Sequence, residues 1–316
     1  AVSRIVEEEG LDMDVVTGGE LAFAIATGFP AERMNFHGNN KGREELIEAV
    51  QYGIACITLD SFAEIDLLNE VAGELGVKQA VMLRLSPSID PHTHLLTSTG
   101  ILDSKFGFSI ETGDAEVAVK LALGKENLEV EGLHFHLGSP IFELEPYSEA
   151  IDYVLKFAAD MRDKYDLELK RFSPGGGFAI GYVADTLPPE MSEYAKEIAS
   201  AIRKGCDTYG LDEPELSVEP GRSLVGRSGV AVSTGGGIKT IPNVRTYVSV
   251  DGGMGDNIRP ALYESEYAVV PVDRPTADRP TLVTVAGKFC ESGDVLARDV
   301  NLPDVETGEL LALPAS

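Results

Sequence analysis

The sequence is poor in cysteine and has no long apolar run. Its three cysteines, Cys56, Cys206 and Cys290, are odd in number and far apart in the chain. This usage argues against a disulfide framework and fits a reducing cytoplasm. No apolar stretch is long enough to span a bilayer, and the first twenty residues contain no basic segment followed by an apolar one. We therefore expect a soluble, unsecreted, cytoplasmic protein.

Basic residues are also scarce. The chain has 26 Lys and Arg against 52 Asp and Glu, which gives a formal net charge of −26. Such a surface repels nucleic acid and anionic membranes, which argues against both as partners. One interpretation is a solvated surface suited to high salt, as in a halophile; the other is an ordinary acidic enzyme. Stability that rises steeply with KCl would favour the first.

Short apolar runs alternate with segments of helical period. The runs lie at 13–16, 34–36, 56–59, 81–85, 132–136, 171–173 and 216–218. The helical segments lie at 43–52, 62–75, 114–123, 144–164 and 190–209. This alternation predicts βαβ units around a parallel sheet. Seven predicted strands before residue 220 are one fewer than a closed βα barrel needs.

The two ends of the chain complete the predicted architecture. The opening AVSRIVEEEG predicts the end of a helix that should follow a strand, so we expect the chain to begin inside its first βα unit. After residue 222 the runs are β-rich and punctuated by glycine, which predicts a mainly antiparallel domain. We predict an α/β fold, a (β/α)8-type TIM barrel without its first strand over 1–224, and a C-terminal β domain over 225–316 that is incomplete at its end.

Polar and glycine-rich clusters follow the later barrel strands. They are HLGS at 136–139, PGGG at 174–177 and EPGR at 219–222. In a βα barrel such strand ends carry the active site, and the late loops often hold a phosphate. Glycines allow close backbone approach, and their N–H groups can surround an anion. One such cluster indicates a turn more often than a phosphate site, but three after successive strands favour the phosphate site.

The stretch EGLHFHLGSP places His134 and His136 two residues apart. A zinc site is not expected, because no cysteine or third histidine accompanies them at ligand-like spacing. A nucleophile pair of Ser139 and His136 lacks the strand–elbow context of hydrolases. We predict no metal site, a packed His134, and a His136 ring that stacks on a planar cofactor. Glu219 could hold a pyridinium N–H, although taken alone it is more simply a structural cap or ion pair.

Five motifs occur in an order that resembles one family. They are HFHLGS, SPGGGF, SVEPGRSLVG, DGGMGDNIRPALY and GKFCESGD. Over nearly its whole length the chain resembles the pyridoxal-phosphate-dependent decarboxylases of the alanine-racemase-like fold. The stretches DPHTHLLTSTGILDSKFGF at 90–108 and GNNK at 38–41 favour the diaminopimelate decarboxylases over the ornithine and arginine decarboxylases.

The resemblance implies pyridoxal 5′-phosphate as the cofactor and assigns residues to it. His136 would stack on the pyridine face, and Glu219 would pair with the pyridine nitrogen. The residues implied for the phosphate are Ser139, Gly175, Gly176, Gly177, Gly221 and Arg222.

The resemblance also implies how an amino-acid substrate is bound. Arg259 and Tyr263 would contact its carboxylate, with Arg222 sharing that task. Cys290 would return a proton to the reacting carbon, and Glu291 would bind the distal ammonium. In this family the last two residues reach into the partner subunit's site, which implies a homodimer. Meso-diaminopimelate has an amino-acid centre at each end, so its distal end needs a cation and an anion together.

Some residues match the family pattern without an assigned role, and two family segments would lie outside this sequence. Lys105, His92 and His94 match the family pattern without a role that we can assign. The family's Schiff-base lysine lies on the first barrel strand, which would precede Ala1, and a Tyr/Asn-containing cofactor segment would follow Ser316. Lys41 matches a different family position.

We therefore expect the core of a diaminopimelate decarboxylase, truncated at both ends and inactive or very weak as given. Its complete form would convert meso-2,6-diaminopimelate to L-lysine and CO2. The alternatives are a related amino-acid decarboxylase of the ornithine or arginine type, and a non-catalytic ligand-binding protein.

Overall fold

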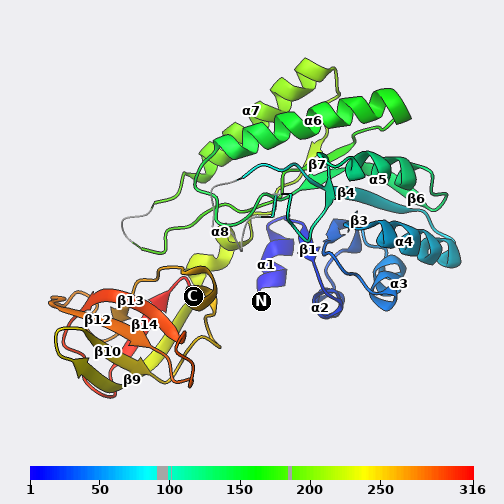
Figure 1. Ribbon diagram of the computed structural model, residues 1–316. Helices are drawn as coiled ribbons and strands as arrows, with labels where there is room; N and C mark the ends of the chain where they lie inside the picture. The colour runs from blue at the N-terminus through cyan, green and yellow to red at the C-terminus, as the bar shows by residue number, and fades with distance from the viewer. Residues whose placement is uncertain (91–98, 101, 184–186) are drawn as a thin grey trace. The chain divides into compact units, whose positions relative to one another are not determined.

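The computed structural model describes residues 1–90, 99–100, 102–183 and 187–316. The chain divides into two compact units (Figure 1). Among the described residues, the first comprises 1–90, 99–100, 102–177 and Met191–Glu219, and the second comprises 178–183, 187–190 and Pro220–Ser316. The domain boundary after residue 224 stays a prediction.

The first unit is built on a parallel sheet with the strand order β1-β2-β3-β4-β6-β7-β8, and β5 pairs with β4 off this path. The strands are β1 (Met13–Val15), β2 (Met34–Phe36), β3 (Cys56–Leu59), β4 (Gln79–Ser86), β5 (Phe108–Ser109), β6 (Leu128–Phe135), β7 (Arg171–Ser173) and β8 (Glu215–Leu216). All of these ladders are parallel. Within the described residues no ladder joins β8 to β1. The predicted α/β fold with an unclosed barrel sheet is confirmed.

Apolar runs form the inner strands because both faces of the sheet are covered. All four residues of β3 are buried, the pattern of a parallel strand with helices on one face and the barrel interior on the other. Each of the seven predicted runs overlaps a strand. The eighth strand, β5, escaped prediction because two residues carry no periodic signal.

Helices accompany these strands. They are α1 (Val2–Glu8), α2 (Gly18–Thr27), α3 (Arg43–Tyr52), α4 (Phe62–Leu75), α5 (Asp114–Leu123), α6 (Glu145–Tyr165) and α7 (Met191–Tyr209), with a 3-10 turn η1 (Ala31–Arg33). The predicted helical segments are confirmed, including the opening one. Gly28, Gly53 and Gly76 end α2, α3 and α4 at φ values of 74°, 83° and 67°, a left-handed conformation that favours glycine.

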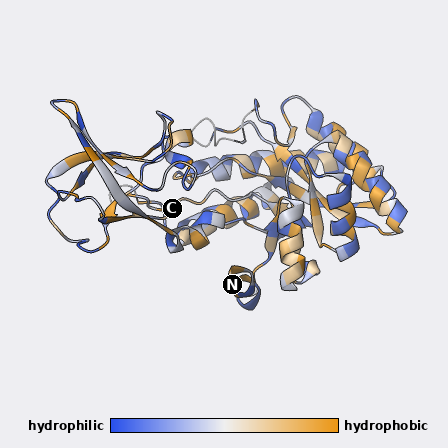
Figure 2. Ribbon diagram, turned by 90° about the horizontal axis from the view of Figure 1, so that it is seen from below, coloured by the Kyte–Doolittle hydropathy of each residue, from blue (hydrophilic) through white to orange (hydrophobic). Residues whose placement is uncertain are grey.

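The same helices show both hydrophilic and hydrophobic stretches (Figure 2), as expected of helices that pack one face against a sheet. Among the described residues, no helix has the length and apolar character needed to cross a membrane.

The second unit is a six-stranded sheet with the order β11-β14-β9-β10-β12-β13. Its elements are α8 (Gly221–Val225), η3 (Gly226–Ser228), β9 (Val230–Ile241), β10 (Arg245–Val250), α9 (Arg259–Tyr263), β11 (Val270–Pro271), β12 (Thr281–Ala286), β13 (Val295–Leu302) and β14 (Leu310–Pro314). Only the β10–β12 ladder among these is parallel. The unit has its own apolar core, which includes Tyr267, Val285 and Leu311. The predicted, mainly antiparallel C-terminal domain is confirmed.

Candidate active site

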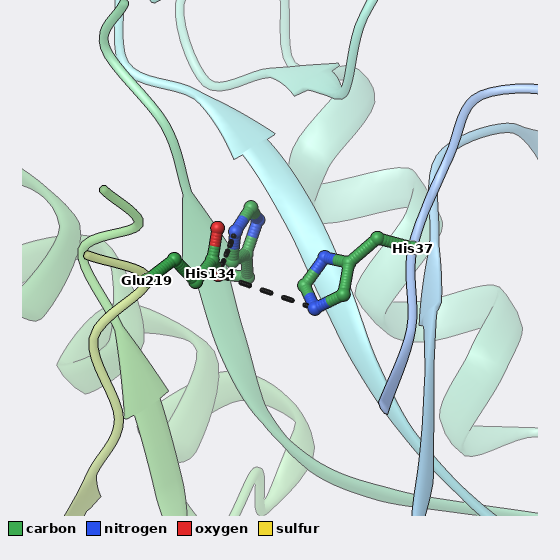
Figure 3. Close-up of side chains that lie close together, drawn as sticks. All are labelled: His37, His134 and Glu219. Carbon is green, nitrogen blue, oxygen red and sulfur yellow. Dashed lines mark hydrogen bonds and ion pairs between the residues drawn. The ribbon is translucent and has the colours of Figure 1, made fainter. Parts of the chain in front are cut away.

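Three side chains from distant parts of the first unit converge at the strand ends (Figure 3). His37 follows β2, His134 lies in β6, and Glu219 follows β8. His134 Nε2 lies 2.8 Å from Glu219 Oε1, and His37 Nε2 lies 4.0 Å from the same oxygen. The two imidazole rings meet edge to face with their centroids 5.0 Å apart. The strands are parallel, so residues at their carboxyl ends meet at one edge of the sheet.

Glu219 is the centre of this group. Ser173 Oγ donates a hydrogen bond to Glu219 Oε1 at 3.1 Å. Burial by itself would raise the pKa of the carboxyl. His134 and His37 outweigh that effect and hold the pKa below its usual value. The carboxylate is therefore ionised, and 24% of the side chain is exposed to accept a further donor.

His134 supports Glu219 as a neutral donor. Its ring is 1% exposed, and burial lowers its pKa despite the attraction of Glu219. In the neutral form, Nε2 carries the proton that hydrogen-bonds to the carboxylate. His134 Nδ1 is buried and has no hydrogen-bond partner in the described part of the chain. His134 is therefore a packed strand residue and also a partner of Glu219, which its position in the sequence did not indicate.

Sequence reasoning missed His37. Burial lowers the pKa of His37, but Glu219 and Asp14 reverse that effect and raise it above its ordinary value. The contact with Asp14 joins His37 Nε2 to Asp14 Oδ1 at 3.5 Å. The one sequence signal was its position directly before the GNNK motif.

His136 lies just beyond β6, and its ring has a defined protonation state. Its Nδ1 accepts a hydrogen bond from the Gly176 N–H at 3.1 Å. A backbone N–H can only donate, so Nδ1 carries no proton and the single ring proton is on Nε2. Burial lowers the pKa of His136 to about 4, which keeps the ring neutral at pH 7. A flat, neutral ring suits the predicted stacking role.

The PGGG loop packs closely against its neighbours. A Cβ on Gly176 would lie 1.9 Å from the Glu219 carbonyl oxygen, and one on Gly177 would lie 2.2 Å from the Gly138 oxygen. Gly175, at a φ of +74°, would place a Cβ 2.6 Å from another backbone oxygen. Only glycine allows this approach. Ser139 follows Gly138 in the chain and therefore lies close to the same loop.

Two arginines of the second unit gather around Tyr182. The Cζ atoms of Arg222 and Arg259 lie 5.9 Å and 5.8 Å from the centroid of the Tyr182 ring. Arg259 Cζ also lies 5.1 Å from the Tyr263 ring. Arg222 Nη1 and Arg259 Nε are buried without a hydrogen-bond partner among the described residues. Burial, with Arg259 adding to it, lowers the pKa of Arg222. Such desolvated N–H groups favour an anion.

Cys290 and Glu291 lie on the loop between β12 and β13, and both are exposed. The buried Asp294 holds this loop, because its carboxylate accepts the Met254 N–H at 2.6 Å and the Phe289 N–H at 2.8 Å. These bonds tie the GKFCESGD motif to the DGGMGD motif. Sequence reasoning did not assign this role to Asp294.

The predicted residues therefore fall into two groups. His136, Ser139, the three loop glycines and Glu219 belong to the first unit, whereas Gly221, Arg222, Arg259, Tyr263, Cys290 and Glu291 belong to the second. His92 and His94 lie outside the described residues.

Two lysines, Lys41 and Lys105, lie in stretches that match the family pattern. Lys41 is buried, and its ammonium contacts Glu64 Oε1 at 2.5 Å and the carbonyl oxygens of Gly38 and Thr58 at 2.6 Å and 2.8 Å. The two hydrogen bonds to carbonyl oxygens and the ion pair with Glu64 hold the ammonium, so Lys41 is poorly placed to act as a nucleophile. Lys105 is exposed, with Nζ 4.8 Å from the Phe106 ring.

His37, His134 and Glu219 lie close enough together to bind a metal ion. The ligand atoms of His37, His134 and Glu219 all lie within 4.8 Å of one another. A metal-binding histidine usually donates from its other ring nitrogen, but His134 Nδ1 has no partner among the described residues. The absence of a metal site stays a prediction.

The chain matches the pyridoxal binding domain of the pyridoxal-dependent decarboxylases over residues 1–226 and the C-terminal sheet domain of the same family over residues 145–316. The diaminopimelate decarboxylase of Bacillus subtilis (strain 168) is 46% identical over 313 residues, which are 99% of this chain and 71% of that protein.

Solved structures extend the likeness. The diaminopimelate decarboxylase of M. jannaschii in co-complex with L-lysine has a TM-score of 0.90 at 35% identity, covering 99% of this chain and 71% of that one. The lysine/ornithine decarboxylase of Vibrio vulnificus complexed with cadaverine has a TM-score of 0.81 at 21% identity, covering 99% and 78%, and shares the fold. The predicted truncation at both ends stays a prediction.

Proposed function

The chain belongs to the pyridoxal-dependent decarboxylase family, and we propose that it acts in the conversion of meso-2,6-diaminopimelate to L-lysine and CO2. The observation that carries the proposal is the Glu219 carboxylate, which is kept ionised at the strand ends by His134 and His37. The identity to diaminopimelate decarboxylases supports the choice of substrate over ornithine or arginine.

The residues present fit pyridoxal 5′-phosphate, the cofactor of the family. Glu219 offers an ionised acceptor for a pyridinium N–H, and His136 offers a neutral ring to cover one face. Arg222 Nη1, buried without a partner among the described residues, is a donor suited to the phosphate. When bound, the pyridinium ring accepts the electron pair left by the departing carboxylate.

Different residues of the chain hold the nitrogen, the face and the phosphate of the cofactor. Glu219 keeps the proton on the ring nitrogen, because an ionised carboxylate attracts the protonated form. His136 orients the ring through a fixed Nε2–H tautomer, which the Gly176 N–H sets. Ser139, the loop glycines and Gly221 hold the phosphate together with Arg222.

Substrate recognition is proposed for residues of the second unit. Arg259 and Tyr263 bind a carboxylate, and the orphan Nε of Arg259 is suited to this task. Glu291 binds the distal ammonium and Cys290 delivers a proton. Both side chains are exposed, as expected of residues offered to a partner subunit, so we propose a homodimer. Light scattering on the purified protein should give twice the chain mass of 33.8 kDa.

We place this enzyme in the cytoplasm. Cys56 and Cys206 are buried as free thiols, and burial raises the pKa of Cys56 to about 12, so neither is suited to a disulfide. This usage fits a reducing compartment.

The test combines cofactor binding with substrate choice. Pyridoxal phosphate is added, borohydride reduces any imine, and intact mass with peptide mapping locates an adduct. Release of CO2 from meso-2,6-diaminopimelate, ornithine and arginine is measured in parallel. Release from diaminopimelate alone supports the proposal, and release from ornithine or arginine favours the related decarboxylases. Cofactor binding with no release from any of the three would favour the non-catalytic alternative, and no adduct would support the predicted inactivity.

A further inference from the structure

Tyr182 faces Arg222 and Arg259, two of the arginines of the second unit. We propose that it is a positioning residue that holds Arg222 and Arg259 at a fixed separation, so that recognition of a phosphate and of a carboxylate depends on one ring. The inference rests on the proposed function and deepens it, because it assigns a role to a residue that no sequence motif singled out.

The geometry suits a shared platform. Both guanidinium carbons lie within 6 Å of the Tyr182 centroid, at 5.9 Å and 5.8 Å, which is the range of a cation–π contact. The two cations repel each other, and the charge of Arg259 helps to lower the pKa of Arg222. The negative face of an aromatic ring attracts both cations and offsets part of this repulsion.

Tyr182 is itself fixed by the core of the second unit. Its ring meets the ring of Tyr267 edge to face, with centroids 5.1 Å apart and planes at 66°. Tyr267 is 2% exposed and belongs to the apolar core, against which Tyr182 packs. These contacts anchor the ring against the core of the second unit.

The arginines keep donors free for ligands while they rest on this ring. Arg259 Nη2 donates to Ser265 Oγ at 3.3 Å, whereas its Nε has no partner among the described residues. Arg222 Nη1 likewise has none in that part of the chain. The Tyr182 hydroxyl also interacts with Arg222. Arg222 Nη1 and Arg259 Nε stay available to an anion beside this contact.

The competing explanation is that Tyr182 only fills space. An aliphatic side chain would then serve as well, and the arginines would not sense its loss. We therefore compare Tyr182→Leu and Tyr182→Met, which lack the ring, with Tyr182→Phe, which keeps it. Tyr247→Leu is the matched control, since Tyr247 is a half-buried tyrosine of the same unit on β10 and neighbours the buried Val248.

The first readout needs no ligand. In the full chain labelled with ¹⁵N-arginine, the Nε–Hε signals of Arg222 and Arg259 are assigned from R222K and R259K. The ring current of residue 182 should displace both Nε–Hε signals from the usual arginine position in the wild type and in Tyr182→Phe. This displacement should disappear in Tyr182→Leu and Tyr182→Met and persist in the control Tyr247→Leu. Should either arginine signal stay unchanged on loss of the ring, the shared platform is wrong.

The second readout is anion affinity, measured with inorganic phosphate and with pimelate as a plain dicarboxylate. Loss of the ring should weaken each by about 2- to 5-fold, the amount expected from one cation–π contact. Tyr182→Phe should restore both affinities. Weakening of only one anion, or equal weakening in Tyr247→Leu, would overturn the inference. Failure of the wild type to bind pyridoxal phosphate would contradict the proposed function, while these two probes still decide the role of Tyr182.

Discussion

Protonation of His136 offers the sharpest quantitative test of the site. Its pKa is lowered from 6.5 to about 4 because the ring is buried. A group with a folded pKa below its unfolded value binds its proton more readily in the unfolded chain. Its stabilising contribution is therefore complete above pH 6.5 and is lost as the pH falls from 6.5 to about 4.

The size of the effect follows from the same shift. At roughly 1.4 kcal/mol per pH unit, the fall to about 4 corresponds to about 3 kcal/mol of unfolding free energy. His136→Gln removes the titrating group, so between pH 7 and pH 4 the variant should lose about 3 kcal/mol less than the wild type. His134 and His37 titrate in both proteins, so the difference reports on His136 together with its electrostatic coupling to these two rings.

Urea unfolding at a series of pH values from about 4 to about 7.5 measures this difference. His136→Phe is the companion variant, because it also lacks the titration but cannot accept the Gly176 N–H. At pH 7 it should be less stable than His136→Gln by about 1 to 3 kcal/mol. NMR of the wild type gives the pKa directly. A value near 6.5, or parallel pH curves for wild type and variant, would refute the buried, neutral ring.

Three further predictions concern the loops and the surface. Asp294→Ala removes the acceptor of two backbone N–H groups, so the unfolding free energy in urea should fall by about 2 to 4 kcal/mol; an unchanged value would show that the carboxylate does not hold the Cys290 loop. Gly176→Ala should lower the unfolding free energy by more than about 2 kcal/mol, because a Cβ has no room there, whereas Gly221→Ala should lower it by less than about 0.5 kcal/mol, because a Cβ there meets nothing within 4 Å. Equal decreases in melting temperature for the two variants would contradict the close packing of the PGGG loop at 174–177. If the net charge of −26 reflects adaptation to salt, the melting temperature should rise steeply between about 0.1 M and about 2 M KCl, and a flat response would favour an ordinary acidic enzyme.

Local pattern was sufficient to predict most of the first unit. Strands of a parallel sheet are continuous apolar runs, and the helices between them begin at polar caps and end at glycine. The run at 56–59 and strand β3 coincide, and so do the segment 62–75 and helix α4. The pairing register of the strands could not be predicted from the sequence. The β4–β6 ladder, for example, shifts its register between Val81 and Met82, and no local sequence pattern marks this shift.

The sequence allowed prediction of those site residues that belong to a motif, but not of those whose role depends on contacts with distant parts of the chain. Glu219 and His136 lie in clusters that follow strands, so their position drew attention. His37 only borders the GNNK motif and Tyr182 lies in none of the motifs, and their importance arises from contacts with residues far along the chain. No periodicity in a single sequence records such contacts.

The choice of imidazole as the partner of Glu219 has a physical reason. An arginine or lysine in direct contact would neutralise the carboxylate and weaken its attraction for a pyridinium N–H. The neutral His134 donates a hydrogen bond and leaves the negative charge in place. The nearby cation Arg84 is instead drawn to Asp60, with Nη1 3.6 Å from Oδ2. The strand ends thus stabilise an ionised Glu219 through the attraction of His134 and His37 and through the hydrogen bond from His134. Its charge remains available to a ligand that carries a proton.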